Sequence, residues 1–309
     1  MRFAAQGPAD RHAYIATRRF TPYAPRLYGI AVRYRPPHIV GIMISKLFKS
    51  RTASKTSTSV VPEGQRVYAV GDIHGCVELL DELIALIDAD DAQRGPAETT
   101  LIFLGDIVDR GPASAAVIDR LIDLSKTRGT VRFLLGNHEE IFLGALDGEP
   151  KALRLFCRIG GRETILSYGM DATEYERLDY EELVHRLAEL VPQEHRAFIS
   201  AFEDMIVIGD YAFVHAGVRP DAPLDRQRSS DLRWIRDPFL EHRNKLEKTI
   251  VHGHTMTDEV EHRNHRIGVD TGAYASGKLT ALGLEGGDVW HLQTNGSDRS
   301  NPALEHPAR

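Results

Sequence analysis

The chain has 309 residues, of which 42% are hydrophobic and 27% charged, a composition typical of a globular protein with a buried core. It contains no run of about 18 apolar residues, so we expect no membrane span and predict a cytoplasmic protein. The net charge of -6 gives no support for stable nucleic-acid binding by the whole chain. Cys76 and Cys157 are too few for a disulfide framework, so both are expected to be reduced thiols.

The first 50 residues are rich in Lys and Arg and contain a single acidic residue, Asp10. Such a leader resembles an organelle transit peptide. Met43, however, opens a stretch that resembles a natural short N-terminus, and the polar run at residues 51–59 resembles a linker. We predict a disordered basic leader over residues 1–60 and favour Met43 as the true start. The polar tail at residues 295–309 is also predicted to be disordered.

Three strand–helix pairs are predicted in the first part of the domain. The strands are rich in β-branched and aliphatic residues, end in Gly followed by Asp or Asn, and are expected at residues 66–72, 100–106 and 131–137. Helices are expected at residues 77–88 and 114–126 and from near Glu139. Successive βα units predict a parallel sheet covered by helices, with the chemistry at the carboxyl ends of its strands.

The middle of the chain, residues 141–203, has mostly helical patterns, and we predict that it forms a helical cap over the site. Residues 160–164 interrupt it, either as a simple helix-breaking turn or as a turn near the substrate. Six short strands should follow, at residues 205–208, 211–215, 249–252, 266–269, 279–284 and 289–292. We assign residues 61–294, cap included, to one folded domain.

Five short motifs carry the candidate chemistry. They are GDIHG at 71–75, GDIVDRG at 105–111, GNHE at 136–139, VHAG at 214–217 and HGHT at 252–255. Each is weak alone, because an Asp or Asn after a strand is usually a cap or turn residue. Together they place Asp, His and Asn side chains just past apolar strands, where one cleft can gather them.

These side chains suit two divalent cations. Asp72 and His74 are two residues apart, so an extended backbone directs both to the same side. Asp106, on the neighbouring strand, can bridge two ions with its two oxygens. The shell of the second ion would be completed by Asn137, His215 and His254. The mixed oxygen and nitrogen set favours Mn²⁺, with Fe or Zn²⁺ as alternatives, over Ca²⁺. Two ions about 3.5–4 Å apart can activate a bridging water.

The order and residue sequences of the motifs resemble those of the metallophosphoesterase superfamily, and within it the phosphoprotein phosphatase family, over residues 66–292. The resemblance implies an α/β fold, a four-layer α/β/β/α sandwich with two central sheets, flanking helices and the cap as an insertion. It implies that Asp72 and His74 hold the first metal and that Asp106 bridges to the second.

The same resemblance implies the catalytic roles. His138 would protonate the leaving oxygen and be oriented by Asp109. Arg110 would bind the phosphate, because a guanidinium bonds two phosphate oxygens at once. Arg236 is our choice for the second arginine, with Arg233 as the competitor. His252 is either an outer partner of a metal ligand or a structural residue.

Three positions favour the phosphoprotein phosphatase branch. Met256 stands where broader superfamily members, nucleases included, carry a further His. Symmetrical diadenosine-tetraphosphate hydrolases resemble the chain strongly but typically lack the acid that Asp109 supplies. Asp109 together with Glu139 therefore favours phosphatases. The tyrosine-bearing regulatory loop of eukaryotic members is not visible at residues 268–273, so no eukaryotic-type regulatory partner is inferred.

The leading prediction is a metal-dependent phosphomonoesterase, a serine/threonine protein phosphatase in which a dimetal-bound hydroxide attacks phosphorus in line. The alternative is a symmetrical dinucleoside-polyphosphate hydrolase or RNA-decapping enzyme with the same metal site. A non-catalytic module would show gaps in the ligand set, and none is seen. The predicted partner is a phosphorylated protein or a small phosphoester; the sequence leaves the native metal pair and oligomeric state open.

Overall fold

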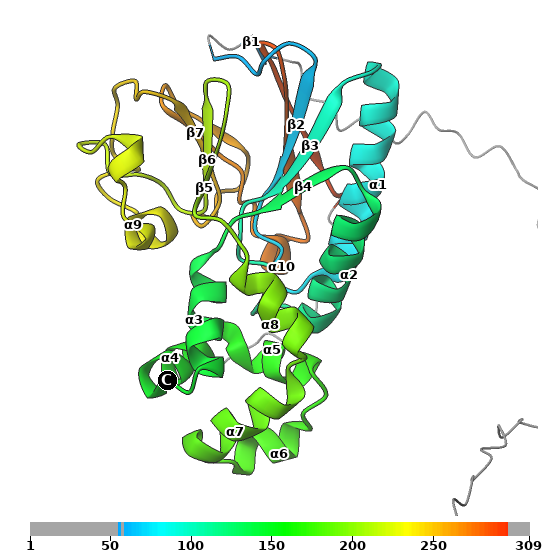
Figure 1. The fold of residues 1–309 in the computed structure, drawn as a ribbon, viewed down its shortest axis with the longest axis vertical. Coiled ribbons are helices and arrows are strands. Elements are labelled where there is room, and N and C mark those ends of the chain that lie inside the picture. The colour runs from blue at the N-terminus through cyan, green and yellow to red at the C-terminus, as the bar shows by residue number, and fades with distance from the viewer. Residues whose placement is uncertain (1–54, 57–58, 296–309) are drawn as a thin grey trace, which may run out of the picture. The chain divides into compact units, whose positions relative to one another are not determined.

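The computed structural model describes residues 55–56 and 59–295 (Figure 1). Most of the predicted leader, Met43 included, and residues 296–309 of the predicted tail lie outside this part of the chain. Within it, no helix is long and apolar enough to cross a bilayer.

The first of two central sheets has the strand order β1-β11-β10-β2-β3-β4. Its strands are β1 Lys55–Thr56, β2 Gln65–Val70, β3 Glu98–Phe103, β4 Thr130–Phe133, β10 Thr280–Glu285 and β11 Asp288–Gln293. β2, β3 and β4 are parallel, as predicted, so their carboxyl ends lie at one edge. β10 and β11 form an antiparallel hairpin beside β2, which makes the sheet mixed rather than parallel throughout.

The second sheet has the order β5-β6-β7-β9-β8. Its strands are β5 Met205–Ile208, β6 Tyr211–Val214, β7 Thr249–His252, β8 Glu261–His262 and β9 Arg266–Gly268. β6, β7 and β9 are parallel, so this sheet also directs several carboxyl ends to one edge. Val67 and Ile102 of the first sheet share a buried apolar cluster with Phe213 and Val251 of the second, which shows that the sheets pack face to face.

Helices cover the outer face of the first sheet (Figure 1). They are α1 Val77–Arg94 and α2 Ser114–Thr127. The predicted apolar face of α1 is buried: Leu80 and Leu83 pack with Val117 and Leu121 of α2 and with Tyr68 of β2. On the second sheet, the outer layer is thinner than the four-layer prediction suggested. It contains the six-residue helix α9 Ser229–Trp234 and irregular chain, packed in one cluster with the sheet.

The middle of the chain is helical, as predicted. It comprises α3 Asn137–Leu146, α4 Pro150–Phe156, α5 Arg162–Ser167, α6 Ala172–Arg177, α7 Tyr180–Leu190 and α8 Gln193–Ser200. A π-helical turn, Cys157–Gly161, joins α4 to α5 and is kinked at Gly160, whose φ is 117°. The predicted interruption at 160–164 is therefore shorter than expected, because α5 already begins at Arg162. α5 and α8 both contact α2, so this helical cap is attached to the helix layer of the first sheet.

Two further short helices follow Pro223 and Gly272: a 3-10 turn at Leu224–Arg226 and α10 at Ala273–Ser276. The sequence predicted neither. Left-handed glycines flank α10 on both sides, Gly272 with φ 71° and Gly277 with φ 71°.

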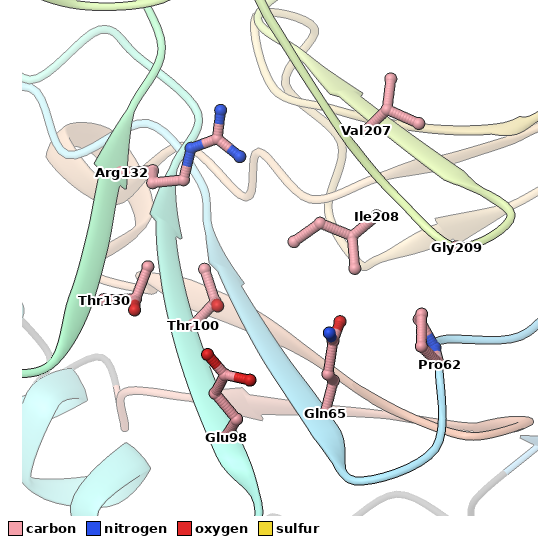
Figure 2. A pocket seen from close by; sticks show the side chains of 9 residues that line it. All are labelled: Pro62, Gln65, Glu98, Thr100, Thr130, Arg132, Val207, Ile208 and Gly209. Carbon is pink, nitrogen blue, oxygen red and sulfur yellow. The ribbon is translucent and has the colours of Figure 1, made fainter.

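A surface pocket of about 390 Å³ lies between the edges of the two sheets (Figure 2). Its walls include Gln65, Glu98 and Thr130, the first residues of β2, β3 and β4, and Gly209 in the turn between β5 and β6. The pocket is therefore at the amino ends of the parallel strands. None of the predicted site residues lines it.

Candidate active site

The predicted site residues follow the carboxyl ends of strands from both sheets. They are Asp72 and His74 after β2, Asp106 after β3, Asn137 and His138 after β4, His215 after β6 and His254 after β7. Because the sheets pack face to face, these loops meet at one edge of the sandwich. All seven side chains except His254 are at most 5% exposed. The fold thus gathers residues that are up to 182 positions apart in sequence, the separation of Asp72 and His254.

Two groups of potential ligand atoms share the carboxylate of Asp106. His74, Asp106 and His138 form one group and Asp106, His215 and His254 the other, with the ligand atoms of each group within 4.8 Å of one another. Oδ2 of Asp106 lies 3.8 Å from Nε2 of His74 and 3.4 Å from Nε2 of His215. A carboxylate between two clusters has the geometry of a bridging ligand.

The histidines are oriented as metal ligands commonly are. His74 donates from Nδ1 to the backbone oxygen of Val108 at 2.7 Å, and His215 donates from Nδ1 to the backbone oxygen of Leu104 at 2.8 Å. Each ring is thereby fixed with Nε2 directed at Asp106. A backbone hydrogen bond on one ring nitrogen, with the other nitrogen available, is typical of His that binds a metal.

Electrostatics also favour a cation. Burial raises the pKa of Asp72 well above its ordinary value, and the nearby carboxylates of Asp270 and Asp106 add to the effect. Burial lowers the pKa of His74 to about 3, so this imidazole is neutral and Nε2 carries a lone pair. Burial also disfavours charge on His215, but the attraction of Asp106 outweighs it and raises the pKa to about 10. A divalent cation would relieve the crowding of carboxylates and replace that proton, so the donor set fits two such ions.

Asp72 and Asn137 each contact a residue of the second group. Asp72 accepts the backbone N–H of His254 at 3.2 and 3.1 Å, and a Cβ at Gly253 would collide with its carboxylate. Oδ1 of Asn137 accepts a hydrogen bond from Nε2 of His215 at 3.0 Å. The structure therefore brings together all six predicted ligands. His138, the predicted acid, also lies with His74 and Asp106 in the first group.

The predicted acid pair is in direct contact. His138 donates from Nδ1 to Oδ2 of Asp109 at 2.6 Å, and both side chains are buried. Nη2 of Arg110 lies 2.9 Å from Nε2 of His138, and Nη1 of the same guanidinium is 2.7 Å from Nε2 of His74. Arg110 thus lies across the cluster, with its guanidinium in contact with both histidines.

Backbone strain is concentrated in the same residues. Within the described part of the chain, the non-glycine residues with a left-handed φ are His74, Asp106, Asp109, Arg110 and His254. Every one of them is a predicted site residue. Left-handed backbone costs on the order of 1–3 kcal/mol per residue and persists only where surrounding contacts enforce it, so the fold holds this loop cluster in one arrangement.

Glu139 supplies part of that enforcement. Its fully buried carboxylate accepts backbone N–H groups from Asp106 at 2.8 Å, Ile107 at 2.8 Å, Val108 at 3.2 Å and Gly136 at 3.0 Å. Burial, with a further contribution from Asp106, raises its pKa to about 7. Glu139 therefore holds the loop that carries Asp106 and is not directed at the metal groups.

The two candidate arginines differ in their partners. Arg233 is engaged by Asp204 at 2.5 Å and by Glu140 at 2.9 Å. Arg236 is exposed, donates to Oγ1 of Thr255 at 3.3 Å and has no carboxylate partner among the described residues. It lies near His254, whose pKa is lowered to about 3, chiefly by burial and then by charges including Arg236.

The sequence matches the family model described as calcineurin-like phosphoesterase over residues 65–281, which include β2, β3 and β4 of the first sheet, the cap and the whole second sheet. This chain belongs to the calcineurin-like phosphoesterase family. With its shared carboxylate and histidine groups, it is a metal-dependent hydrolase of phosphoric ester or anhydride bonds. The alternative of a non-catalytic module is therefore wrong.

Curated relatives of this phosphoesterase include bis(5'-nucleosyl)-tetraphosphatases PrpE [asymmetrical]. The protein from Anoxybacillus flavithermus is 28% identical over 233 residues, 69% of this chain and 88% of the relative. That from Bacillus mycoides is 28% identical over 236 residues, with the same shares. A crystal structure of a protein assigned as a diadenosine tetraphosphatase superimposes with a TM-score of 0.54 at 23% identity, over 78% of this chain and 99% of the other. This last likeness supports the fold.

Sequence reasoning missed three residues of this phosphoesterase site. The ring of Tyr274, in α10, is 5.4 Å from that of His74 and 5.0 Å from the guanidinium carbon of Arg110. Asp270 is a third buried carboxylate beside Asp72. Thr164, in α5, contacts Asp109. Tyr274 and Asp270 belong to none of the five motifs, and Thr164 lies in the interruption at 160–164, for which a turn near the substrate is one of the two interpretations. Residues 268–273, in which the sequence shows no tyrosine, are followed directly by Tyr274.

The remaining open positions are decided by their contacts. His252 donates from Nδ1 to the backbone oxygen of Gly253 at 2.9 Å and accepts from Arg266 at 3.3 Å, which agrees with the structural interpretation. Gly160 accepts the backbone N–H of Arg110 at 3.0 Å. The turn at Gly160 therefore reaches the site and is more than a helix break.

Proposed function

We propose that this phosphoesterase hydrolyses dinucleoside polyphosphates. The observation that carries the proposal is its similarity to the bis(5'-nucleosyl)-tetraphosphatases over 69% of this chain and 88% of each relative. This reverses the order of the two sequence-based hypotheses, in which the protein phosphatase came first. The curated relatives are of the asymmetrical type, so we also propose cleavage into unequal products rather than the symmetrical cleavage of the original alternative.

The two arginines support a polyphosphate substrate. Arg110 lies across the histidine groups and can bind the phosphate that reacts. Arg236 is exposed near His254 and is free of carboxylate partners among the described residues, so it can bind a second phosphate of the chain. Arg233 is a weaker candidate because two carboxylates already bind its guanidinium. Planar guanidinium groups are well suited to bidentate binding of phosphate oxygens.

The protein's own groups then have distinct tasks. Two divalent cations held by the Asp and His groups would supply a nucleophilic water at neutral pH and stabilise charge on the phosphate. A new P–O bond forms to the water oxygen, and the bond to the leaving oxygen breaks with its electron pair. His138, held at Nδ1 by Asp109, gives its Nε2 proton to that oxygen. Its pKa is raised because attraction by Asp106 and Asp109 outweighs burial, which keeps the proton available.

A second candidate substrate class is phosphoserine or phosphothreonine. The close His138–Asp109 pair favours it, because an alkoxide leaves poorly unless it is protonated, whereas a phosphate leaves an anhydride more easily.

The discriminating experiment compares two substrates with Mn²⁺-loaded protein. We expect kcat/KM for diadenosine tetraphosphate to exceed that for a phosphothreonine peptide by at least about tenfold. Chromatography of the nucleotide products should show AMP and ATP. Two molecules of ADP would instead support symmetrical cleavage, and a preference for the peptide would reject the dinucleotide proposal.

Arg236→Ala should lower kcat/KM for diadenosine tetraphosphate about 10–100-fold, as expected for the loss of a charge-assisted hydrogen bond worth roughly 1.5–3 kcal/mol. Arg233→Ala is the matched control. It breaks the ion pairs with Asp204 and Glu140, so its main effect should be a lower melting temperature. The opposite pattern, with the activity loss in Arg233→Ala, would assign the second phosphate contact to Arg233.

A further inference from the structure

The helical cap is hydrogen-bonded to the loop that carries Asp109 and Arg110. Thr164, in α5 of the cap, donates from its hydroxyl to Oδ1 of Asp109 at 2.7 Å. The same hydroxyl oxygen accepts the backbone N–H of Asp109 at 2.9 Å. Thr164 and Asp109 therefore bind each other twice, although they are 55 positions apart in sequence.

The other oxygen of the same carboxylate binds the proposed acid. Oδ2 of Asp109 accepts from Nδ1 of His138 at 2.6 Å, while Oδ1 is held by Thr164. Each carboxylate oxygen thus has one partner, and the two partners fix the plane of the carboxylate. The orientation of that plane sets the orientation of the His138 ring, and so the direction in which Nε2 points.

Burial makes this arrangement strict. Thr164, Asp109 and Ser114 are all 0% exposed, so their polar atoms depend on partners within the protein. The hydroxyl proton of Thr164 goes to Asp109, so Ser114 supplies the proton in its 2.9 Å hydrogen bond with Thr164. Ser114 also accepts the backbone N–H of Asp109 at 3.1 Å. In a dry environment, a hydroxyl removed from such a network cannot be replaced by solvent.

A second contact from the cap holds the next residue. The carbonyl oxygen of Gly160 accepts the backbone N–H of Arg110 at 3.0 Å, and a Cβ at position 160 would lie 2.8 Å from Cγ of Arg110. Asp109 and Arg110 have left-handed φ angles of 72° and 67°, which are unfavourable for residues with a side chain. The cap therefore secures both residues of this dipeptide in a conformation that they would not adopt alone.

We propose that Thr164 is a positioning residue for phosphoester hydrolysis, which orients Asp109 so that His138 presents Nε2 to the leaving oxygen. Thr164 belongs to neither group of potential metal ligands and acts through Asp109. The cap thus does more than cover the site, because one of its residues orients the proposed acid through Asp109. This inference rests on the acid role proposed for His138.

The experiment compares Thr164→Val with Thr164→Ser, on phenyl phosphate as a poor leaving group and p-nitrophenyl phosphate as a good one. Valine has nearly the shape of threonine but no hydroxyl, whereas serine keeps the hydroxyl. We expect Thr164→Val to lower kcat for phenyl phosphate about 10–100-fold, the range typical of lost outer-shell hydrogen bonds. For p-nitrophenyl phosphate the loss should be less than about threefold, because that leaving group needs little protonation.

Two comparisons test whether the loss in Thr164→Val comes from the missing hydroxyl and acts through His138. Thr164→Ser should restore kcat for phenyl phosphate to within about threefold of wild type. In a His138→Ala background, Thr164→Val should cause no further loss. Thr294→Val is the matched control, since Thr294 is equally buried, accepts the backbone N–H of Leu279 and donates to Gly277, and does not touch the acid pair. It should leave the ratio of the two substrates unchanged.

Equal losses on both substrates in Thr164→Val, or a further loss in the His138→Ala background, would overturn the inference. If Thr164→Val does not fold, Ser114→Ala removes the donor to Thr164 and should produce a smaller, several-fold loss confined to phenyl phosphate; a uniform loss would again overturn it. Failure of the proposed acid is distinguishable, because His138→Ala itself would then show no dependence on the leaving group.

Discussion

Asp106→Asn should lower kcat/KM by at least about 10³-fold on any phosphoester substrate. Oδ2 of Asp106 lies between the two ligand groups, 3.8 Å from His74 and 3.4 Å from His215. An amide has no negative charge with which to bridge two cations. Charge stabilisation by a metal is worth several kcal/mol, and every 1.36 kcal/mol corresponds to a factor of ten in rate.

The fold should survive this substitution. Oδ1 of Asp106 accepts the backbone N–H of His138 at 3.0 Å, and the carbonyl oxygen of Asn can accept the same bond. Hydrolysis of p-nitrophenyl phosphate with Mn²⁺, together with metal content by mass spectrometry, tests the prediction. Asp123→Asn, the same change on the exposed face of α2, is the control and should behave as wild type. Two bound ions and near-normal activity in Asp106→Asn would contradict the bridging role.

His138→Ala should lower kcat about 10²–10⁴-fold for an alkyl phosphate, the usual contribution of a general acid. The loss should shrink as the leaving group improves and be smallest for p-nitrophenyl phosphate. The geometry behind this is the 2.6 Å hydrogen bond from Nδ1 to Asp109, which leaves Nε2 directed into the cluster. Initial rates across a series of aryl and alkyl phosphates would measure the dependence.

Metal content separates the acid role from a ligand role. His138 lies within 4.8 Å of the ligand atoms of His74 and Asp106, so it could in principle bind an ion. An acid can be removed with both ions retained, whereas loss of a ligand should release one. His195→Ala is the matched control: His195 is also buried and bound to a carboxylate, Asp119 at 2.9 Å, but in the cap. Wild-type turnover of an alkyl phosphate in His138→Ala would reject the acid assignment.

The strand–helix units and their polar carboxyl ends could be predicted because their signals are local. A run of β-branched residues followed by Gly-Asp or Gly-Asn predicts a strand and its end from a few neighbouring residues alone. β2, β3 and β4 are accordingly parallel and lie where the pattern predicted. The β10–β11 hairpin beside β2 could not be predicted, because its antiparallel pairing with Val67 and Val70 joins segments more than 200 positions apart.

The choice between the two arginines shows a similar limit. Arg233 and Arg236 both lie close to Trp234 in the sequence, so the preference for Arg236 rests on the family resemblance alone. Their difference comes from Glu140 and Asp204, which the fold brings to Arg233 and not to Arg236. Charge partners of this kind are long-range contacts, so no local pattern could have distinguished the two.

The sequence by itself determined the chemistry of the site: which residues bear carboxylates, imidazoles and guanidinium groups, and that they follow strands whose ends converge. Only the tertiary structure decided their orientation. The left-handed backbone of Asp109 and Arg110 is held by Thr164 and Gly160 of the cap, across separations that no motif spans. The physical reason is that donor type belongs to the individual residue. The direction of a donor depends on buried hydrogen bonds, which exist only once the chain has folded.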